Sequence, residues 1–364
     1  MTAPTPRPGI LDIAPYKGGD SSIEGVERVI KLASNEGALG PSPLAVDAIK
    51  AAAGDVHRYP DGHCTALRQA IAERYELDPA RLVFGAGSDE LLSLICQAYA
   101  GEGDEVLYSA HGFLMYGISA KAAGATPVTA PETNLTADVD NLLAAVTERT
   151  KILFLANPNN PTGTWLPRAE VERLRDGLRD DILLVLDSAY AEYMDDERYS
   201  AGVELVESTP NTVMTRTFSK IYALGGVRLG WAYAPEDVIG VINRVRGPFN
   251  VNTPAQAAGL AAFHDREFLD RSRRHNATWR SWTEQQVRGL GCEVPQSAAN
   301  FVLVRFPGPA EAEAADGFLR ARGIIVRRMA AYGLPDSLRV SIGLEDEMRT
   351  FVDALAAFRE GAAQ

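Results

Sequence analysis

Cysteine is scarce in this sequence, which contains three among its 364 residues. Cys64, Cys96 and Cys292 lie far apart, and they form neither a CxxC pair nor a cysteine–histidine spacing typical of a metal site. Disulfide-rich domains and structural zinc sites need several cysteines at short spacings. We therefore expect a protein of a reducing compartment, without a bound metal, in which the three thiols are small buried hydrophobes.

The sequence also lacks an excess of positive charge and any long apolar run. Lysine and arginine number 36 against 48 aspartates and glutamates, so the formal net charge is −12. Nucleic acids and anionic membranes attract basic proteins, so neither is expected as a partner. No segment approaches the ~20 apolar residues of a membrane span, and the N-terminal "MTAPTPRPGI" has no apolar signal core. We expect a cytoplasmic location.

What the sequence does contain is an alternation of short apolar runs and helical patterns between about residues 65 and 245. Such runs, separated by amphipathic segments, are typical of a parallel sheet with helices on both faces. The runs are "RLVFGAG", "DEVLYSA", "KILFLANP", "ILLVLDSAY", "TVMTRTFS" and "RLGWAYAP". The pattern predicts an α/β fold with a mostly parallel sheet covered by helices.

The pattern changes near residue 250. A helical stretch over about residues 254–290 precedes a smaller α/β region. A chain of this length exceeds the usual limit for one hydrophobic core, so two domains are expected. We predict an N-terminal arm over residues 1–45 that joins the small domain and a large domain over residues 46–250. The small domain is predicted over residues 251–364, beginning with a long linking helix.

Polar residues follow the apolar runs at the points where the strands are expected to end. They are Ser88, Asp89, Asn157, Asp187, Tyr190, Ser219 and Lys220. Open parallel sheets bind ligands at the carboxyl ends of their strands. We therefore expect these side chains to surround one ligand.

Ser88 with Asp89, and separately Asp187, could also have a purely structural role. Ser88 and Asp89 open an apolar helix after two glycines, which suits either a phosphate at the helix N-terminus or a plain helix cap. Asp187 ends a buried strand, where a carboxylate is costly unless it meets a cation or a metal. No metal-like grouping accompanies Asp187, which favours a cationic partner, with a helix cap as the alternative.

The stretch "TFSKIYALGGVRLGW" places Lys220 and Arg228 in a nearly apolar segment. A lysine in dry surroundings can become a nucleophilic amine. Ser219 and Arg228 beside it could hold a phosphate, and Phe113 offers an aromatic face. Pyridoxal phosphate requires an amine, a carboxylate for its ring nitrogen, donors for its phenolic oxygen, an aromatic face and a phosphate site. These residues therefore predict pyridoxal 5′-phosphate as the cofactor.

Nine ordered stretches resemble the fold-type I pyridoxal-phosphate aminotransferases, and among them most closely the histidinol-phosphate aminotransferases. They are "KLASNE…LGPSP", "RYPDG", "GAGSDELL", "HGFLMY", "NPNNPTG", "LDSAY", "TFSKIYALGGVRLGW", "RGPFNVN" and "SLRVSIG", between about residues 10 and 345. The resemblance implies the fold-type I architecture. It also implies that Lys220 bonds the cofactor aldehyde and then moves a proton between the substrate α-carbon and the cofactor.

The resemblance implies roles for the other cofactor residues as well. Asp187 would pair with the ring nitrogen, and Phe113 would stack on the ring. Asn157 and Tyr190 would bind the phenolic oxygen. The phosphate would be held by Ser88, Asp89, Ser219 and Arg228. Tyr59 resembles the tyrosine that reaches the cofactor phosphate of the neighbouring subunit, which implies a homodimer with a shared active site.

The substrate residues implied by the resemblance come from the arm and the small domain. Arg339 would bind the substrate carboxylate, and Arg327 would help hold its distal anion. Tyr16 and Asn35 belong to the arm that closes over the substrate. Where the family often has "NENPLG", this chain has "NEGALG", so Gly37 and Ala38 are expected to make the arm less rigid.

The resemblance implies transamination of L-histidinol phosphate with 2-oxoglutarate, in histidine biosynthesis. Imidazole-acetol phosphate and glutamate would be the products. An aromatic amino acid aminotransferase is the alternative within the same class. A pyridoxal-phosphate lyase that decarboxylates a phosphorylated amino acid is a third possibility, because these motifs do not encode which bond at the substrate α-carbon is broken. A non-catalytic cofactor sensor is disfavoured, since the sequence shows no DNA-binding module.

Overall fold

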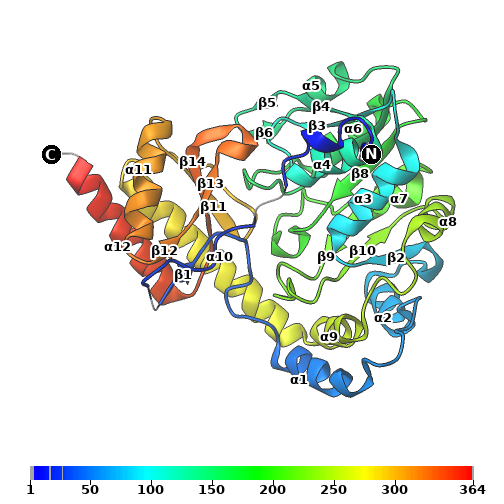
Figure 1. Cartoon of the computed structure of the whole chain (residues 1–364), viewed down its shortest axis with the longest axis horizontal. Helices are drawn as coiled ribbons and strands as arrows, with labels where there is room; N and C mark the ends of the chain where they lie inside the picture. The colour runs from blue at the N-terminus through cyan, green and yellow to red at the C-terminus, as the bar shows by residue number, and fades with distance from the viewer. Residues whose placement is uncertain (1–3, 16–17, 27, 363–364) are drawn as a thin grey trace.

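The computed structural model describes residues 4–15, 18–26 and 28–362, and a seven-stranded sheet forms the centre of its larger part (Figure 1). The strand order is β2-β10-β9-β8-β7-β3-β4. All pairs are parallel except those of β10, which runs antiparallel to both neighbours. The strands are β2 (Leu82–Gly85), β3 (Glu105–Ser109), β4 (Thr126–Ala130), β7 (Thr150–Ala156), β8 (Leu183–Asp187), β9 (Thr212–Thr217) and β10 (Gly230–Tyr233). The predicted mostly parallel sheet is confirmed. Strand β4 was not predicted, because its sequence "TPVTA" is half polar and lies at the sheet edge.

Helices cover both faces of this sheet because its strands are apolar on both faces. Leu183 and Val185 of β8 pack on one side, while Leu184 and Leu186 pack on the other. Successive side chains of a strand point to opposite faces, so this continuous run needs two helical layers. The first face is covered by α3 (Ser88–Tyr99), α4 (Leu114–Ala123) and α8 (Glu236–Val245). The other is covered by α2 (Thr65–Tyr75), α5 (Val139–Ala144), α6 (Arg168–Gly177), α7 (Val203–Ser208) and α9 (Thr253–His264), with α1 (Pro43–Ala52) against α9.

A smaller antiparallel sheet lies at the other end of the molecule and has its own core (Figure 1). Its order is β11-β14-β13, formed by β11 (Phe301–Arg305), β14 (Leu334–Ser341) and β13 (Arg327–Met329). The helices around it are α10 (Arg266–Gly289), α11 (Pro309–Arg320) and α12 (Glu345–Ala362). Strand β1 (Ile30–Lys31) pairs in parallel with β12 (Ile324–Ile325), so the arm is attached to this smaller part.

The remaining short elements connect these layers. Strands β5 (Glu132–Thr133) and β6 (Thr136–Ala137) form a hairpin. Single 3-10 turns occur at η1 (Ile10–Asp12), η2 (Ala53–Asp55), η3 (Pro79–Arg81), η4 (Ala191–Tyr193) and η5 (Ala330–Tyr332). None of the described helices is long and apolar enough to span a membrane. The three cysteines are buried and unpaired.

The helix predicted over residues 254–290 is in fact two helices that meet at Asp265. The Asp265 carboxylate accepts a hydrogen bond from the backbone N–H of Phe268 at 3.1 Å and another from the hydroxyl of Ser42. Asp265 therefore caps the start of α10, which ends α9. Because α9 packs into the core of the larger sheet, we propose that the domain boundary lies near Asp265 rather than at residue 250.

A buried ion pair joins β9 to η4, with Arg216 on β9 and Glu192 on η4. Arg216 Nη2 lies 2.8 Å from Glu192 Oε1, and both side chains are less than a tenth exposed. We predict that Arg216→Met lowers the free energy of unfolding by about 3–5 kcal/mol, because the Glu192 carboxylate would stay buried without its cation. Unfolding in guanidinium chloride measures the change.

The matched control is Lys50→Met, which breaks the exposed pair between Lys50 and Asp47. Exposed pairs contribute little, so this variant should stay within about 0.5 kcal/mol of the native chain. An unfolding midpoint of Arg216→Met equal to that of Lys50→Met would show that the buried pair does not stabilise the fold.

Candidate active site

A cavity of about 540 Å³ opens at the carboxyl ends of β7, β8 and β9. Ala156, Asp187 and Thr217, the last residues of these three strands, all line it. The predicted residues that line the cavity are Asn35, Ser88, Asp89, Phe113, Asp187, Tyr190, Ser219, Lys220 and Arg228. The structure thus brings together nine side chains that are spread over almost 200 positions of the chain.

Asp187 is the most unusual group in the cavity, because it is buried and only half satisfied. The Tyr116 hydroxyl donates to Asp187 Oδ2 at 2.7 Å. The other oxygen, Oδ1, is buried and has no hydrogen-bond partner among the described residues. Burial raises the pKa of Asp187, while the Tyr116 hydrogen bond and the Lys220 charge act in the opposite direction. A ligand that places a positively charged N–H group against Oδ1 would remove the energetic cost of burying this carboxylate.

Tyr116 is a site residue that the sequence did not reveal. It lies fully buried on α4 and stacks on Phe154 with ring centroids 4.6 Å apart. Burial and the neighbouring Asp187 charge raise the pKa of Tyr116 well above its usual value, so its hydroxyl stays protonated and can donate. A buried tyrosine in an apolar helix pattern is indistinguishable from a core residue in the sequence. The one available signal was its place in the matched stretch "HGFLMY".

Lys220 and Tyr190 lie on one side of the cavity, next to the arm. Lys220 Nζ lies 5.8 Å from the centre of the Tyr190 ring. The Asn35 amide donates to the Tyr190 hydroxyl at 2.9 Å, and the Asn35 backbone N–H donates to Ser341 Oγ at 2.8 Å. Asn35 therefore joins the wall of the cavity to β14 of the smaller sheet.

The start of α3 forms a cradle between two glycines. A Cβ on Gly87 would lie 2.2 Å from Arg228 Nη2, and one on Gly230 would lie 2.3 Å from the Ser88 nitrogen. Only glycine leaves the backbone N–H groups of the helix start open to a ligand at these two points. Exposed N–H groups at a helix start favour an anion.

Arg228 and Ser219 complete this cradle. Arg228 Nη1 donates to the Gly225 carbonyl at 3.0 Å and lies 3.5 Å from Ser219 Oγ. Its Nη2 pairs with the Asp89 carboxylate. Since a carboxylate repels an anion, we propose that the Asp89 side chain orients Arg228 and that Asp89 offers an anion its backbone N–H instead.

The amide that lines the cavity is that of Asn160, not that of Asn157. Asn157 Nδ2 donates to the Leu166 carbonyl at 3.0 Å, and its Oδ1 accepts from the Leu166 N–H at 2.9 Å. This pairing turns the Asn157 amide into the turn, and Asn157 does not line the cavity. We therefore propose Asn160, rather than Asn157, for the predicted role at the phenolic oxygen. The sequence "NPNNPTG" offered two equivalent asparagines before proline and no way to choose between them.

Arg339 lies directly behind Asn160. It is buried on β14, donates to Asn160 Oδ1 through Nη1, and donates to the Ala33 carbonyl through Nη2 at 3.0 Å. Its Nε is buried without a hydrogen-bond partner among the described residues. Arg339 is not among the residues that line the cavity, but Asn160, to which it donates, is.

Besides Asn157 and Arg339, two predicted site residues that the structure describes do not line this cavity. Arg327 is the register partner of Arg339 but lines a neighbouring cavity of about 980 Å³, together with His111 and Tyr332. Tyr59 is 84% exposed and stacks on Phe249 with ring centroids 4.8 Å apart. Tyr16 lies outside the described residues.

Comparison with known proteins defines the class to which this fold and site belong. The sequence model of the family described as "Aminotransferase class I and II" matches residues 27–355. The match covers most of the chain and includes every residue described above as lining the 540 Å³ cavity. The chain therefore belongs to the class I and II aminotransferases and is a pyridoxal-phosphate-dependent enzyme by family.

Curated relatives narrow this assignment. A histidinol-phosphate aminotransferase of Paramagnetospirillum magneticum is 64% identical over 98% of this chain and 99% of its own. One of Rhodospirillum rubrum is 59% identical over 98% of both chains. The crystal structure of the histidinol-phosphate aminotransferase of Sinorhizobium meliloti, in complex with pyridoxal-5′-phosphate, superposes with a TM-score of 0.88 at 30% identity, covering 92% of each chain. Within its class, the chain is one of the histidinol-phosphate aminotransferases.

The Tyr116–Asp187 hydrogen bond generates a prediction for pH dependence. Tyr116→Phe removes the hydroxyl that donates to Asp187 Oδ2, so burial should raise the pKa of Asp187 further. Hydrogen bonds to charged groups contribute about 1.5–3 kcal/mol, so kcat/KM should fall roughly tenfold or more. A raised pKa means that Asp187 is protonated at a higher pH than in the native chain. The acid limb of the pH–rate profile should therefore move to higher pH.

Tyr108→Phe is the matched control, because Tyr108 packs against Tyr116 with ring centroids 5.7 Å apart but has no bond to Asp187. Its acid limb should not move. An unmoved acid limb in Tyr116→Phe would mean that this hydroxyl does not set the ionisation of Asp187.

Proposed function

We propose that this chain binds pyridoxal 5′-phosphate and transfers the amino group of L-histidinol phosphate to 2-oxoglutarate. The products are imidazole-acetol phosphate and glutamate, and the reaction belongs to histidine biosynthesis. The observation that carries the proposal is the buried Oδ1 of Asp187, which lacks a partner among the described residues, in the same cavity as Lys220. The names of relatives at 52–64% identity support the substrate.

The residues present fit this cofactor. Asp187 Oδ1 matches a protonated ring nitrogen, and Phe113 matches the face of the ring. The cradle of Ser88, Ser219 and Arg228, kept open by Gly87 and Gly230, matches the phosphate. When bound, pyridoxal phosphate supplies an aldehyde that takes up the amino group and a protonated ring that draws electrons from the substrate α-carbon.

Each residue then has one task in the transfer. Lys220 Nζ, which lines the cavity, would accept the proton that leaves the substrate α-carbon and donate it again later in the transfer. Asp187 stays ionised, held so by Tyr116, and keeps the ring nitrogen protonated. Asn160 and Tyr190 orient the phenolic oxygen through their amide and hydroxyl groups. The apolar lining around Phe113 and Met115 excludes water from the reacting carbon.

Anion recognition falls to arginines from the smaller sheet. Histidinol phosphate brings a phosphate and 2-oxoglutarate brings two carboxylates, so one site must hold different anions in turn. Arg339 and Arg327 are neighbours across β14 and β13. Arg339 binds a substrate anion near Asn160, and Arg327 binds one on the side of the cavity of about 980 Å³. In a chain of net charge −12, these guanidinium groups provide a local attraction for dianions.

The proposal is tested by a paired assay of the purified protein. Histidinol phosphate, phenylalanine and phosphothreonine are each supplied with 2-oxoglutarate, and glutamate and carbon dioxide are measured. We expect glutamate to form fastest from histidinol phosphate. Faster glutamate formation from phenylalanine would favour an aromatic aminotransferase, and carbon dioxide released from phosphothreonine would favour a lyase. Lys220→Ala should lose the activity and the visible absorbance of the bound cofactor, and its retention of both would overturn the cofactor assignment.

A homodimer with a shared active site is part of the same proposal. Tyr59 and Val56 are exposed, and Tyr59 stacks on the half-exposed Phe249. Such a patch suits an interface, and it would bring Tyr59 to the cofactor phosphate of the second subunit. The proposed location is the cytoplasm, where thiols such as the three unpaired cysteines stay reduced.

Subunit mixing tests the shared site directly. Lys220→Ala and Tyr59→Ala should each be strongly impaired. In a hybrid dimer, one site would carry both defects and the other site neither. An equal mixture refolded together should therefore recover roughly a quarter of native activity, because half of the dimers are hybrids with one intact site. Activity no higher than the sum of the two variants would rule out a site shared between subunits.

A further inference from the structure

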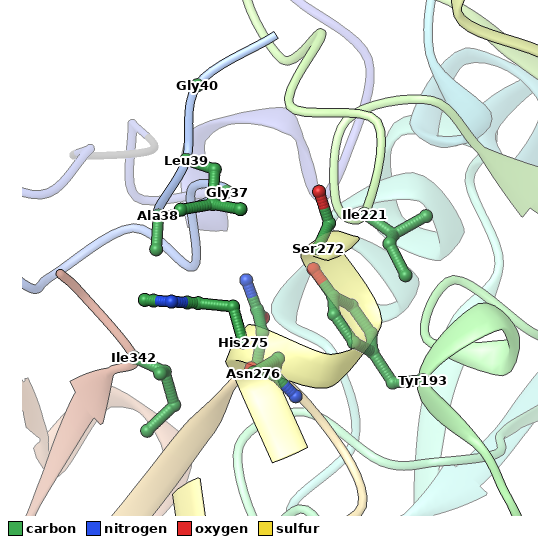
Figure 2. Close-up of a pocket in the computed structure, with 11 residues that line it drawn as sticks. Gly37, Ala38, Leu39, Gly40, Tyr193, Ile221, Ser272, His275, Asn276 and Ile342 are labelled. Atoms are coloured by element: carbon green, nitrogen blue, oxygen red, sulfur yellow. The ribbon is translucent and has the colours of Figure 1, made fainter. Parts of the chain in front are cut away.

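Gly37 of the arm lies against the turn that carries Lys220. Gly37 and Ile221, the residue after Lys220, line one small pocket (Figure 2). A Cβ on Gly37 would lie 2.6 Å from the Ala223 Cβ and 3.1 Å from the Lys220 carbonyl oxygen. Carbon atoms that are not bonded to each other pack at about 3.5–4.0 Å. Any side chain at position 37 would therefore have to move either the arm or the lysine turn.

The lysine turn has little freedom to move. Ala223 N–H donates to the Lys220 carbonyl at 2.9 Å, and Leu224 N–H donates to the Phe218 carbonyl at 3.0 Å. Ala223 adopts a φ of 53°, a left-handed conformation that a residue with a Cβ rarely holds. The turn is therefore fixed in the conformation that places Lys220 in the cavity.

The arm is held just as firmly from the other side. Asn300 Nδ2 donates to the carbonyls of Asn35 and Glu36 at 3.0 and 3.2 Å. Between the arm and α10 there remains a cavity of only about 10 Å³, lined by His275 and Asn276 among others (Figure 2). This volume is close to that of a single water molecule. The arm is thus clamped between α10, β14 and the lysine turn.

We propose that Gly37 is a positioning residue that couples the arm to Lys220. The missing side chain lets the arm rest on the Lys220–Ala223 turn, so the same contact fixes the lysine on one side and Asn35 on the other. The sequence suggested that Gly37 makes the arm less rigid, whereas in the structure Gly37 lies so close to Ala223 that a Cβ would overlap it. The inference rests on the proposed role of Lys220.

The test is a steric exchange between the two contacting positions. Gly37→Ala should lower kcat at least tenfold, because its Cβ displaces the turn that holds Lys220. The pH dependence of the visible absorbance of the bound cofactor should shift as well, which a general loss of stability would not produce. Ala223→Gly removes the opposing Cβ, so the double variant Gly37→Ala with Ala223→Gly should recover kcat to within about threefold of the Ala223→Gly variant.

The control is Gly18→Ala, at an arm glycine whose added Cβ would have no atom of the described residues within 4 Å beyond its chain neighbours. Its kcat should match that of the native protein. Native kcat in Gly37→Ala would overturn the inference, and so would a loss that Ala223→Gly does not restore although Gly37→Ala keeps the native thermal midpoint. A native protein without transaminase activity and without cofactor absorbance would instead refute the proposed function.

Discussion

A buried carboxylate with one unsatisfied oxygen governs the architecture of this active site. Asp187 ends the central strand β8, where the sheet and its helices exclude water on both faces. Removing an ionised carboxylate from water is expensive unless a cation or several donors receive it. Tyr116 donates to Oδ2 and the Ala189 backbone N–H also lowers the pKa of the carboxyl, while Oδ1 has no hydrogen-bond partner among the described residues. The cost of burying the Asp187 carboxylate is therefore offset in full only when a ligand in the cavity binds Oδ1.

The second constraint is that the wall of the cavity is shared between the two sheets. Asn160 belongs to the turn after β7, yet its oxygen accepts a hydrogen bond from Arg339 of β14. The same turn is docked through Gly163, whose carbonyl accepts from the backbone N–H of Ala298 at 2.8 Å. Because these contacts link the larger and smaller parts of the molecule, substrate recognition depends on how closely the two parts pack.

The parts of this arrangement that could be predicted are those set by local patterns. Apolar runs fixed the strands, and the residues that end them, such as Asp187, had to lie at one edge of the sheet. The parts that could not be predicted depend on partners distant in sequence. The break at Asp265 is stabilised by Ser42, and the choice between Asn157 and Asn160 depends on a pairing with Leu166. No pattern near these residues carries that information.

The packing role of glycines is a second feature of the site that the sequence alone does not reveal. In a sequence, "GAG" or "NEGALG" indicates flexibility, because glycine tolerates many backbone conformations. In this fold, a Cβ on Gly230 or Gly37 would overlap a neighbouring backbone segment, and a Cβ on Gly87 would overlap the Arg228 and Asp89 side chains. The first two leave the start of α3 open to an anion, and the third lets the arm reach the lysine turn. The absence of a side chain therefore acts here as a packing requirement, and it makes the site tighter rather than looser.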